Sequence, residues 1–554
     1  MGSQVSVRND RLVEFSEEPV ETPQLAALAA TARLAAVATL AGVALLAGTD
    51  QCAQCHPEAV REYLRSGMGR SITEPGADHP TGVYGHGISG TTFRTSVSDD
   101  GLVQEIERDG LSARYTVDYV IGSGNAAFGY LVRVGDALFQ SPVTYYTERG
   151  RWGMAPGMEG DASPDFERPA IPECLWCHAG APKPVPTTVN RYREPALEPA
   201  AISCDRCHGP AERHLSEPAA ATIFNPAQAA PRVRDSVCEQ CHLGGVIRVL
   251  HPGRDFGDFH PGRRTEEFWT VFVGRSAAPG SERFQVVSHV EQLALSRCAE
   301  ASGDKFWCGT CHNPHKAPAN PKADYSRRCL DCHRQRLASD HLTHEGDCIS
   351  CHMPRRQSHD SGHSAFTDHR ITRRPLPAAA SKPPSQLRPW RPLRGALLLR
   401  NLGIANVRQG QQQGSRSMLR RGRDQLERVT GRFRDDIGML DALGTALVLD
   451  GSPQAGLGPL RRAIAKGPAG ALNYNALAAA WWDAGAPDDA VLMLEEAIRR
   501  EPTLESSYHM LAQIYVDLGR GGMARQVWQR LLEKRPGLIQ ARLAARRMDT
   551  APAP

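Results

Sequence analysis

The pattern Cys-x-x-Cys-His occurs seven times in this 554-residue chain, always between residues 52 and 352. Two thiols three residues apart on one helical turn can each bond a vinyl group of the same haem, and the histidine that follows then points at the iron. Chance would supply on the order of 0.01 such motifs in a chain of this composition. The pattern therefore predicts seven covalently attached c-type haems. Numbered 1 to 7 in chain order, the motifs are Cys52-Cys55-His56, Cys174-Cys177-His178, Cys204-Cys207-His208, Cys238-Cys241-His242, Cys308-Cys311-His312, Cys329-Cys332-His333 and Cys348-Cys351-His352.

Zinc sites and redox dithiols also use paired cysteines, but neither requires a histidine directly after the second one. The seven motifs account for all of the 15 cysteines except Cys298. A leftover cysteine is usually a buried thiol, whereas in an exported protein it can also be an iron ligand or a redox-sensitive group. The sequence leaves both interpretations of Cys298 open.

The motifs are closely spaced along the chain. Seven haems would share the stretch from Cys52 to His369, about 45 residues each. Porphyrins would then form much of the core, so we expect a loop-rich fold with short helices that does not form without haem. Haems packed this closely can pass electrons to one another, and this predicts electron transfer as the function.

Twelve further histidines, beyond the seven of the motifs and His509, are candidates for the second axial position of an iron. His315 follows His312 by three residues and cannot reach the opposite face of the same haem. His214 is similarly close to His208. If these two bind iron, we expect each to bind the haem of another motif.

Several runs of residues resemble a known superfamily. Cys52-Ala-Gln-Cys-His-Pro-Glu, with Tyr63 and Ser66-Gly-Met68, is similar to the opening of the group that contains hydroxylamine oxidoreductase, pentahaem nitrite reductase and small tetrahaem carriers. Further matches are Cys-His-Gly-Pro with His214, Ser288-His289-Val-Glu-Gln, Cys-His-Asn-Pro-His315, Cys-His-Met-Pro354, and His363 to His369 ahead of Arg370-Ile371. Together they resemble multihaem cytochromes with a tetratricopeptide tail, over most of residues 50–375.

The resemblance implies further distal ligands, with His341 and His359 close enough in sequence to substitute for some of them. Met68 stands where the superfamily usually has a distal histidine, so it either binds this iron or merely packs there, with His79 or His86 as the ligand. A thioether ligand there would raise one potential. The chain lacks the Cys-x-x-Cys-Lys motif of pentahaem nitrite reductases, which counts against that chemistry. The candidate distal ligands are Met68, His86, His214, His289, His315, His344, His363 and His369.

Residues 83–150 carry no motif and alternate short β-rich segments with Asp-Gly and Gly-Ser-Gly turns. This pattern predicts an antiparallel β meander inserted into a haem domain that spans residues 49–372. The meander could be plain scaffold, which we favour, or it could wall a substrate pocket.

The C-terminal part contains no cysteine and repeats every 34 residues. Leu443, Leu477 and Leu511 occupy one position of the repeat, and a proline ends each copy. We expect a Pro-rich linker over 373–393, then an all-α tetratricopeptide solenoid over 394–550 that folds as a separable unit. A degenerate earlier repeat is expected near residue 402. Such a solenoid offers a groove to a protein partner, or it could simply cap the cytochrome.

Residues 1–48 include a 14-residue apolar run, Leu34 to Ala47, of the length typical of a signal peptide. An uncleaved membrane anchor is the alternative, although Arg33 would be costly within it. Because c-type haem is attached outside the cytoplasm, we expect a periplasmic or otherwise exported protein. The net charge of +4 and the absence of a basic block argue against nucleic acid as a partner.

Two functions follow from these expectations. The first is an electron carrier that meets redox partner proteins and docks a partner through its tail. The second is a multihaem oxidoreductase that acts on a small nitrogen or sulfur compound at an open haem. Fold-level resemblance does not choose between them.

Overall fold

The computed structural model describes residues 49–76, 78–274, 284–285, 287–334, 347–358, 365–373, 384 and 386–550. The predicted leader or anchor and the candidate ligands His344 and His363 lie outside these residues. Within the described part, no helix is both long and apolar enough to cross a membrane. The described residues fall in one compact unit.

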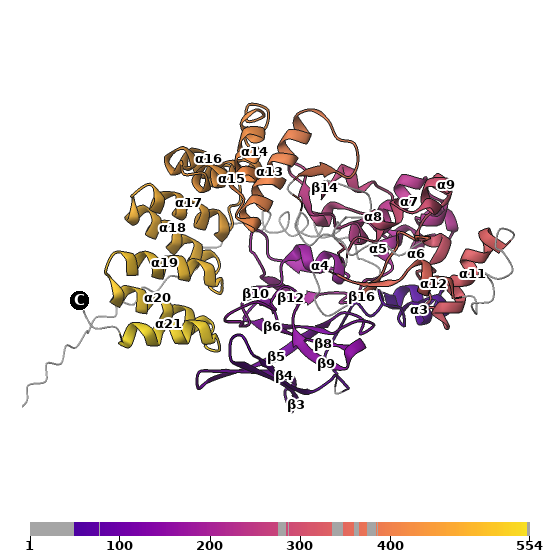
Figure 1. The fold of residues 1–554 in the computed structure, drawn as a ribbon, viewed down its shortest axis with the longest axis horizontal. Helices are drawn as coiled ribbons and strands as arrows, with labels where there is room; N and C mark the ends of the chain where they lie inside the picture. Colours follow the sequence, from indigo (N-terminus) through magenta and orange to yellow (C-terminus); the bar gives the residue numbers. More distant parts are fainter. Residues whose placement is uncertain are drawn as a thin grey trace, which may run out of the picture. The chain divides into compact units, whose positions relative to one another are not determined.

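The antiparallel sheet expected between motifs 1 and 2 is present (Figure 1, indigo and violet). Its consecutive strands pair as hairpins, and Asp109-Gly110, both with positive φ, form the tight turn that an Asp-Gly pair favours. Phe93 on β3 faces Ile106 on β4, and both are buried. The strands are β2 (Gly82–His86), β3 (Thr91–Ser98), β4 (Gly101–Arg108), β5 (Leu111–Ile121), β6 (Gly129–Val134) and β7 (Ala137–Gln140), with β1 (Ile72–Thr73) on β5 and β10 (Arg168–Pro169) on β7.

The motifs lie on or at the ends of short helices between longer irregular segments. Proline at the first turn begins several of these helices, where its missing N–H costs nothing. The helices are α2 (Thr49–Ala53), α3 (Pro57–Tyr63), α4 (Pro172–His178), α5 (Asp205–His208), α6 (Glu212–Ser216), α7 (Pro231–His242), α8 (His289–Ala294), α9 (Arg297–Ser302), α10 (Cys308–Cys311), α11 (Pro321–His333) and α12 (Cys348–His352).

Small antiparallel sheets accompany these helices. β17 (Leu387–Pro389) pairs with β14, so the structure differs here from the linker predicted over 373–393. Its proline stands on an edge strand, where no ladder N–H is needed. The remaining strands are β8 (Val143–Tyr146) with β9 (Arg151–Met154), β11 (Pro182–Pro184) with β12 (Tyr192–Leu197), β13 (Ile247–Leu250) with β14 (Trp269–Gly274), and β15 (Arg355–Gln357) with β16 (Ala365–Thr367).

The C-terminal region consists of antiparallel helix pairs (Figure 1, orange to yellow). Helices α15, α17, α19 and α21 begin at intervals of 34 residues, as the sequence repeat predicts. The degenerate repeat expected near residue 402 is the pair α13–α14. The helices are α13 (Gly395–Gln413), α14 (Arg416–Glu427), α15 (Ile437–Leu449), α16 (Pro453–Lys466), α17 (Ala471–Asp483), α18 (Pro487–Arg500), α19 (Glu505–Asp517), α20 (Gly521–Lys534) and α21 (Ile539–Thr550).

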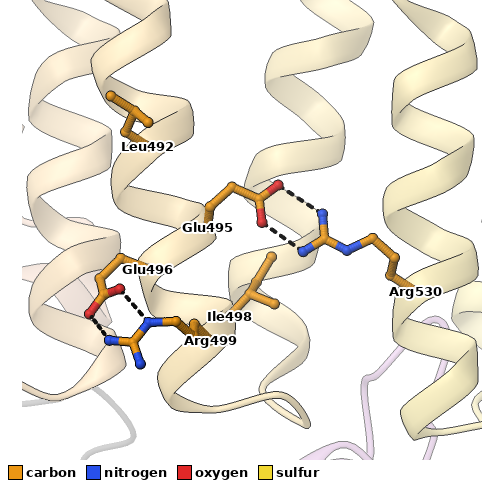
Figure 2. A pocket seen from close by; sticks show the side chains of 6 residues that line it. All are labelled: Leu492, Glu495, Glu496, Ile498, Arg499 and Arg530. Atoms are coloured by element: carbon orange, nitrogen blue, oxygen red, sulfur yellow. Dashed lines mark hydrogen bonds and ion pairs between the residues drawn. The ribbon is translucent and has the colours of Figure 1, made fainter. Parts of the chain in front are cut away.

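Charged side chains join neighbouring repeats at the surface. Arg530 on α20 donates two hydrogen bonds, of 2.8 and 2.6 Å, to Glu495 on α18 (Figure 2). Together with Leu492, Glu496 and Arg499, they line an open pocket of about 500 Å³. The carboxylates here are already paired with arginines of the same solenoid.

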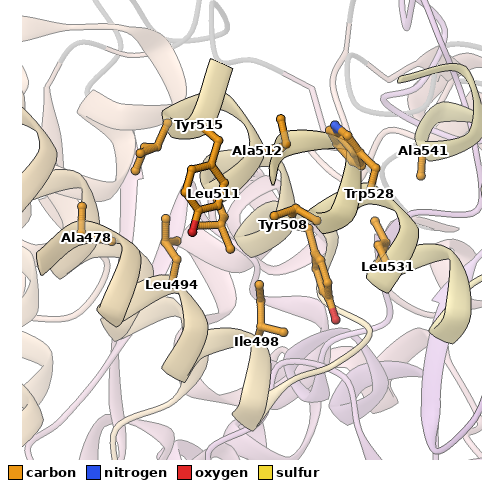
Figure 3. Close-up of a cluster of buried hydrophobic side chains, with 14 of the residues drawn as sticks. Ala478, Leu494, Ile498, Tyr508, Leu511, Ala512, Tyr515, Trp528, Leu531 and Ala541 are labelled. Atoms are coloured by element: carbon orange, nitrogen blue, oxygen red, sulfur yellow. The ribbon is translucent and has the colours of Figure 1, made fainter. Parts of the chain in front are cut away.

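Small residues let the paired helices approach closely. A Cβ added at Gly444 would lie 2.5 Å from Leu460 Cγ, and the repeat places Ala478 and Ala512 at the same position. Leu511 and Leu531 are fully buried in the cluster that joins the last repeats (Figure 3). Burial of one such leucine stabilises a fold by about 2 kcal/mol.

The solenoid shares hydrophobic clusters with the haem-motif part of the chain. Ile539 on α21 is buried in the same cluster as Phe93 and Ile106 of the sheet. Ile404 on α13 shares another with Phe272 on β14. The two parts are therefore packed together in this structure.

Hydrogen bonds reinforce that packing. The Gln540 amide N–H donates to Asp165 Oδ2 at 3.1 Å, and the Asn401 side chain donates to Thr270 Oγ1 at 2.9 Å. Arg535 donates to the carbonyl of Phe166. The bonds from Arg535 and Gln540 fix the loop that leads to motif 2 against the last repeat, and the bond from Asn401 fixes α13 against β14.

Candidate haem-binding site

The backbone of the motifs has the local geometry that haem attachment requires. In motifs 1, 3 and 5 the histidine N–H donates to the carbonyl of the first cysteine, at 2.8, 2.9 and 2.9 Å. This i to i+4 bond closes one helical turn. Residues three and four apart then share a face, so both thiols and the imidazole point the same way.

Four motif histidines lie opposite other histidines. Two metal–imidazole bonds of about 2 Å each, plus about 1.1 Å from each nitrogen to its ring centre, place two axial imidazoles about 6 Å apart. The spacings found are close to this value, so the pairs fit one iron between them. The pairs are His56–His214 (6.3 Å between ring centres, 15° between planes), His208–His315 (5.8 Å, 15°), His312–His369 (6.2 Å, 24°) and His242–His289 (5.4 Å, 89°).

Hydrogen bonds at Nδ1 orient several of these rings and leave Nε2 free for a metal, the arrangement common among ligating histidines. In each bond Nδ1–H donates: His208 Nδ1 to Phe224 O (2.9 Å), His214 Nδ1 to Ala219 O (3.0 Å), His369 Nδ1 to Thr367 O (3.0 Å), and His312 Nδ1 to the hydroxyl oxygen of Tyr325 (3.2 Å).

Burial favours the neutral form of both rings in the His242–His289 pair. Desolvation, followed by the neighbouring His369 and His242, lowers the pKa of His289 to about 3. Desolvation lowers the pKa of His242 to about 4. A neutral imidazole is the form that binds a metal. His289 also lies 4.8 Å from His369 between ring centres, so the motif-4 and motif-5 pairs adjoin.

Two candidates from the resemblance are placed differently. His86 lies on β2 with both ring nitrogens engaged, Nδ1 with Ser89 Oγ at 2.9 Å and Nε2 with Glu159 O at 3.2 Å. Its hydrogen-bonded site in the sheet leaves no nitrogen for iron. Met68 lies half-buried in the turn after α3. The ring opposite His56 is that of His214.

The histidines of motifs 2, 6 and 7 have other surroundings. Among the described residues, no histidine ring lies opposite His178 or His333. His178 ends α4, and desolvation lowers its pKa. His333 ends α11, one residue before a segment that the structure does not describe. His352 Nδ1 contacts Thr372 O at 2.9 Å. The candidates His344 and His363 fall in the undescribed segments near motifs 6 and 7.

Thiols of different motifs lie within hydrogen-bonding reach of one another, so the motifs themselves adjoin. The odd cysteine Cys298 lies near the thiols of Cys311 and Cys332, and desolvation raises its pKa. The motif contacts are Cys52–Cys204, Cys177–Cys241, Cys238–Cys308 and Cys329–Cys348.

Several buried hydrogen-bond donors that have no acceptor lie near motifs 2 to 4. Trp176 Nε1, Trp269 Nε1 and Arg206 Nε are buried and make no hydrogen bond within the described structure. Buried donors normally have acceptors. Haem propionates are carboxylates that could accept from them, so the donor set fits the group. Sequence reasoning missed these side chains, although Trp176 and Arg206 occupy the variable positions of their own motifs.

Two family comparisons match parts of the chain. Residues 154–209 match the family described as cytochrome c554 and c-prime, and residues 300–337 match the doubled CXXCH motif. These matches support a multihaem c-type cytochrome. They cover motifs 2, 3, 5 and 6 of the cytochrome and support covalently bound haem.

Other comparisons concern curated proteins and solved structures. No curated protein matches the chain significantly. A structure described as that of MamA protein is similar at 16% identity, over 27% of this chain and 81% of that chain, with a TM-score of 0.24. A thermophilic TPR protein of Thermus thermophilus is similar at 19% identity, over 28% of this chain and 82% of that chain, with a TM-score of 0.24.

Proposed function

We propose that this cytochrome is an exported electron carrier with seven c-type haems. The main support is the set of four histidine pairs, each with the spacing that one iron requires. In addition, the thiols of different motifs lie close to one another. Bound haem supplies a one-electron iron couple. The chain's part is to hold the group: the cysteine pairs anchor it, and histidines fix its iron from both faces.

The ligand assignment follows the pairs. His214, His315, His289 and His369 serve the irons of motifs 1, 3, 4 and 5. The first two come from segments that follow other motifs, as their spacing requires. Each of these ligands therefore ties its iron to another stretch of the haem part, so folding and haem incorporation are coupled.

Protein docking is the proposed role of the solenoid. Both sets of repeat helices keep apolar side chains at the surface: Leu449, Leu472 and Val516 on α15, α17 and α19, and Leu492 and Met523 on α18 and α20. Exposed apolar side chains on a repeat solenoid suit a protein partner. Because the solenoid packs on the haem part, a partner held there stays near the redox centres.

A second function has one observation in its favour. His178 has no histidine opposite it among the described residues, so motif 2 is the candidate for an open iron. An oxidoreductase acting on a small nitrogen or sulfur compound would use such a site. An EPR spectrum of the oxidised protein separates the two functions, since an open iron is high-spin and seven six-coordinate irons are low-spin.

Haem content tests the proposal directly. Protein from a host with a c-type maturation system should carry seven haems by pyridine haemochrome assay and intact mass. The same chain without its first 48 residues, kept in the cytoplasm, should be free of haem and unfolded. Bound zinc, or four or fewer haems in the matured protein, would contradict it.

A further inference from the structure

Residues from motifs 2, 3 and 4 contact and hydrogen-bond one another at one place in the protein. The Arg206 guanidinium of motif 3 lies 3.5 Å from the ring centre of Trp176 in motif 2 and donates to the Trp176 carbonyl at 2.7 Å. Gln240 of motif 4 donates to the carbonyl of Arg206 at 3.0 Å. All three side chains are buried. We call this the junction.

A second guanidinium completes the junction. Arg248, on β13, donates to the carbonyls of Gln240 at 2.9 Å and Leu243 at 2.7 Å. It also donates to the sulfur of Cys177 at 3.7 Å, and that thiol lies against Cys241. Arg248 therefore touches the attachment residues of motifs 2 and 4 directly.

Neither guanidinium has a carboxylate partner. Arg206 and Arg248 make no ion pair in the described part of the chain, where they bond only carbonyl oxygens and a sulfur. The carboxyls whose charge acts on this region include Glu173, Glu291, Glu239 and Asp205, and none of them forms an ion pair with Arg206 or Arg248. Arg206 is buried and Arg248 is half-buried, so water screens these two charges less than it screens charges at the surface. With no carboxylate bonded to either guanidinium, both contribute a positive local field.

The junction also has a definite place among the motifs. Motif 3 adjoins motif 1 through Cys204 and Cys52, and motif 4 adjoins motif 5 through Cys238 and Cys308. The junction thus connects both sides of the array and brings in motif 2. A field here acts on three irons at once.

We propose that Arg206 and Arg248 raise the reduction potentials of the haems at motifs 2 to 4, so that electrons entering the array collect at the junction. This inference rests on the proposed haem attachment. A nearby positive charge favours ferrous iron, which carries one positive charge fewer than ferric iron. A propionate bound to Arg206 would offset part of the field without changing the sign, because removing the arginine still removes one positive charge.

Spectroelectrochemical titration of the full-length, haem-loaded protein tests this. Arg248→Gln should lower at least one midpoint potential. At the wild-type midpoint, the ratio of reduced to oxidised iron should fall about tenfold, and for a one-electron couple this corresponds to a shift of about 59 mV. Arg206→Gln should act in the same direction. Arg248→Lys keeps the charge and should restore most of the shift. Arg499→Gln removes an exposed arginine of the solenoid and should shift nothing.

Haem content separates the possible failures. Fewer haems in the wild-type protein would contradict the proposed function, whatever the variants do. Seven haems with an unchanged titration in both glutamine variants would overturn the inference. Equal shifts in Arg248→Lys and Arg248→Gln would also overturn it, by showing that hydrogen-bond geometry and not charge sets the potential. Loss of haem from both glutamine variants would assign the arginines a structural role instead.

Discussion

His312 and His369 face each other with their ring centres 6.2 Å apart, although motifs 6 and 7 lie between them in the chain. The backbone N–H of His369 donates to Gln292 of α8 at 2.8 Å, which holds the end of the haem part against α8. The contact brings a segment from beyond the last motif to the face of the motif-5 histidine.

Replacing His369 with methionine tests that relationship. His369→Met keeps a sixth ligand but exchanges imidazole for a thioether, which stabilises ferrous iron. We expect seven haems, one midpoint raised, and a new near-infrared sulfur-to-iron band. His86→Gln is the matched control, because His86 is bonded within the sheet and should leave the haem spectra unchanged. An unaltered set of midpoints in His369→Met would remove His369 from the ligand set.

The angle between ligand planes gives a spectroscopic prediction. His242 and His289 are nearly perpendicular, at 89°, whereas the other three pairs lie within 24° of parallel. Perpendicular imidazoles leave two iron d orbitals nearly equal in energy, which makes the low-spin EPR signal highly anisotropic. We expect one such large-gmax signal beside ordinary rhombic ones, and its loss in His289→Ala. A spectrum of rhombic signals alone would exclude the perpendicular pair.

The attachment motifs could be predicted from sequence because their chemistry requires neighbouring residues on one turn. The distal histidines are different, because tertiary packing decides which rings meet. Spacing placed His214 and His315 away from their own motifs' irons, and the structure sets them against His56 and His208. Sequence spacing alone could not identify these partners. Nor could it show that hydrogen bonds in the sheet occupy both ring nitrogens of His86.

The repeats show the same contrast between local structure, which the sequence predicts, and tertiary packing, which it does not. A 34-residue period fixes helix starts locally, and the helices begin where it predicts. The packing of Ile404 and Ile539 on the haem part depends on surfaces far away in sequence. The sequence therefore predicted a separable solenoid, while the structure shows shared hydrophobic clusters.

Met68 provides a further test. Since His214 lies opposite His56, we expect Met68→Leu to retain seven haems and every midpoint, and the wild type to lack a near-infrared thioether band. Near-infrared magnetic circular dichroism of the oxidised protein measures this. A band that Met68→Leu removes would establish Met68 as a ligand and assign His214 another role.

The shared clusters predict coupled unfolding. Ile539 is fully buried against the sheet, so Ile539→Ala should destabilise the protein by about 2–4 kcal/mol. Thermal unfolding followed by helical circular dichroism and by haem absorbance should shift together. Leu472→Ala, at a residue 53% exposed, should shift neither signal. A change confined to the helical signal would show that the solenoid is independent after all.

The contact between the loop before motif 2 and the solenoid predicts that the stability of the protein depends on pH. Desolvation and the hydrogen-bonded carboxyl of Glu505 on α19 raise the pKa of Glu167 from 4.5 to about 9. Desolvation also raises the pKa of the adjacent Asp165 to about 6. A carboxyl whose pKa rises on folding contributes stability that is complete below its unfolded pKa and is lost as pH rises through the folded value. Asp165 accordingly loses its contribution by about pH 6, and Glu167 by about pH 9.

Glu167→Gln removes the ionisation while keeping the hydrogen bond to Glu505. We expect the wild-type melting temperature to fall between pH 6 and pH 9, and the variant to lose less over the same range. Below pH 4.5 the two proteins should melt alike, because Glu167 is then protonated in both the folded and the unfolded wild type. Glu300→Gln, at an exposed ion pair, controls for the change in net charge. Parallel pH profiles for wild type and Glu167→Gln would show that ionisation of Glu167 does not govern the pH dependence.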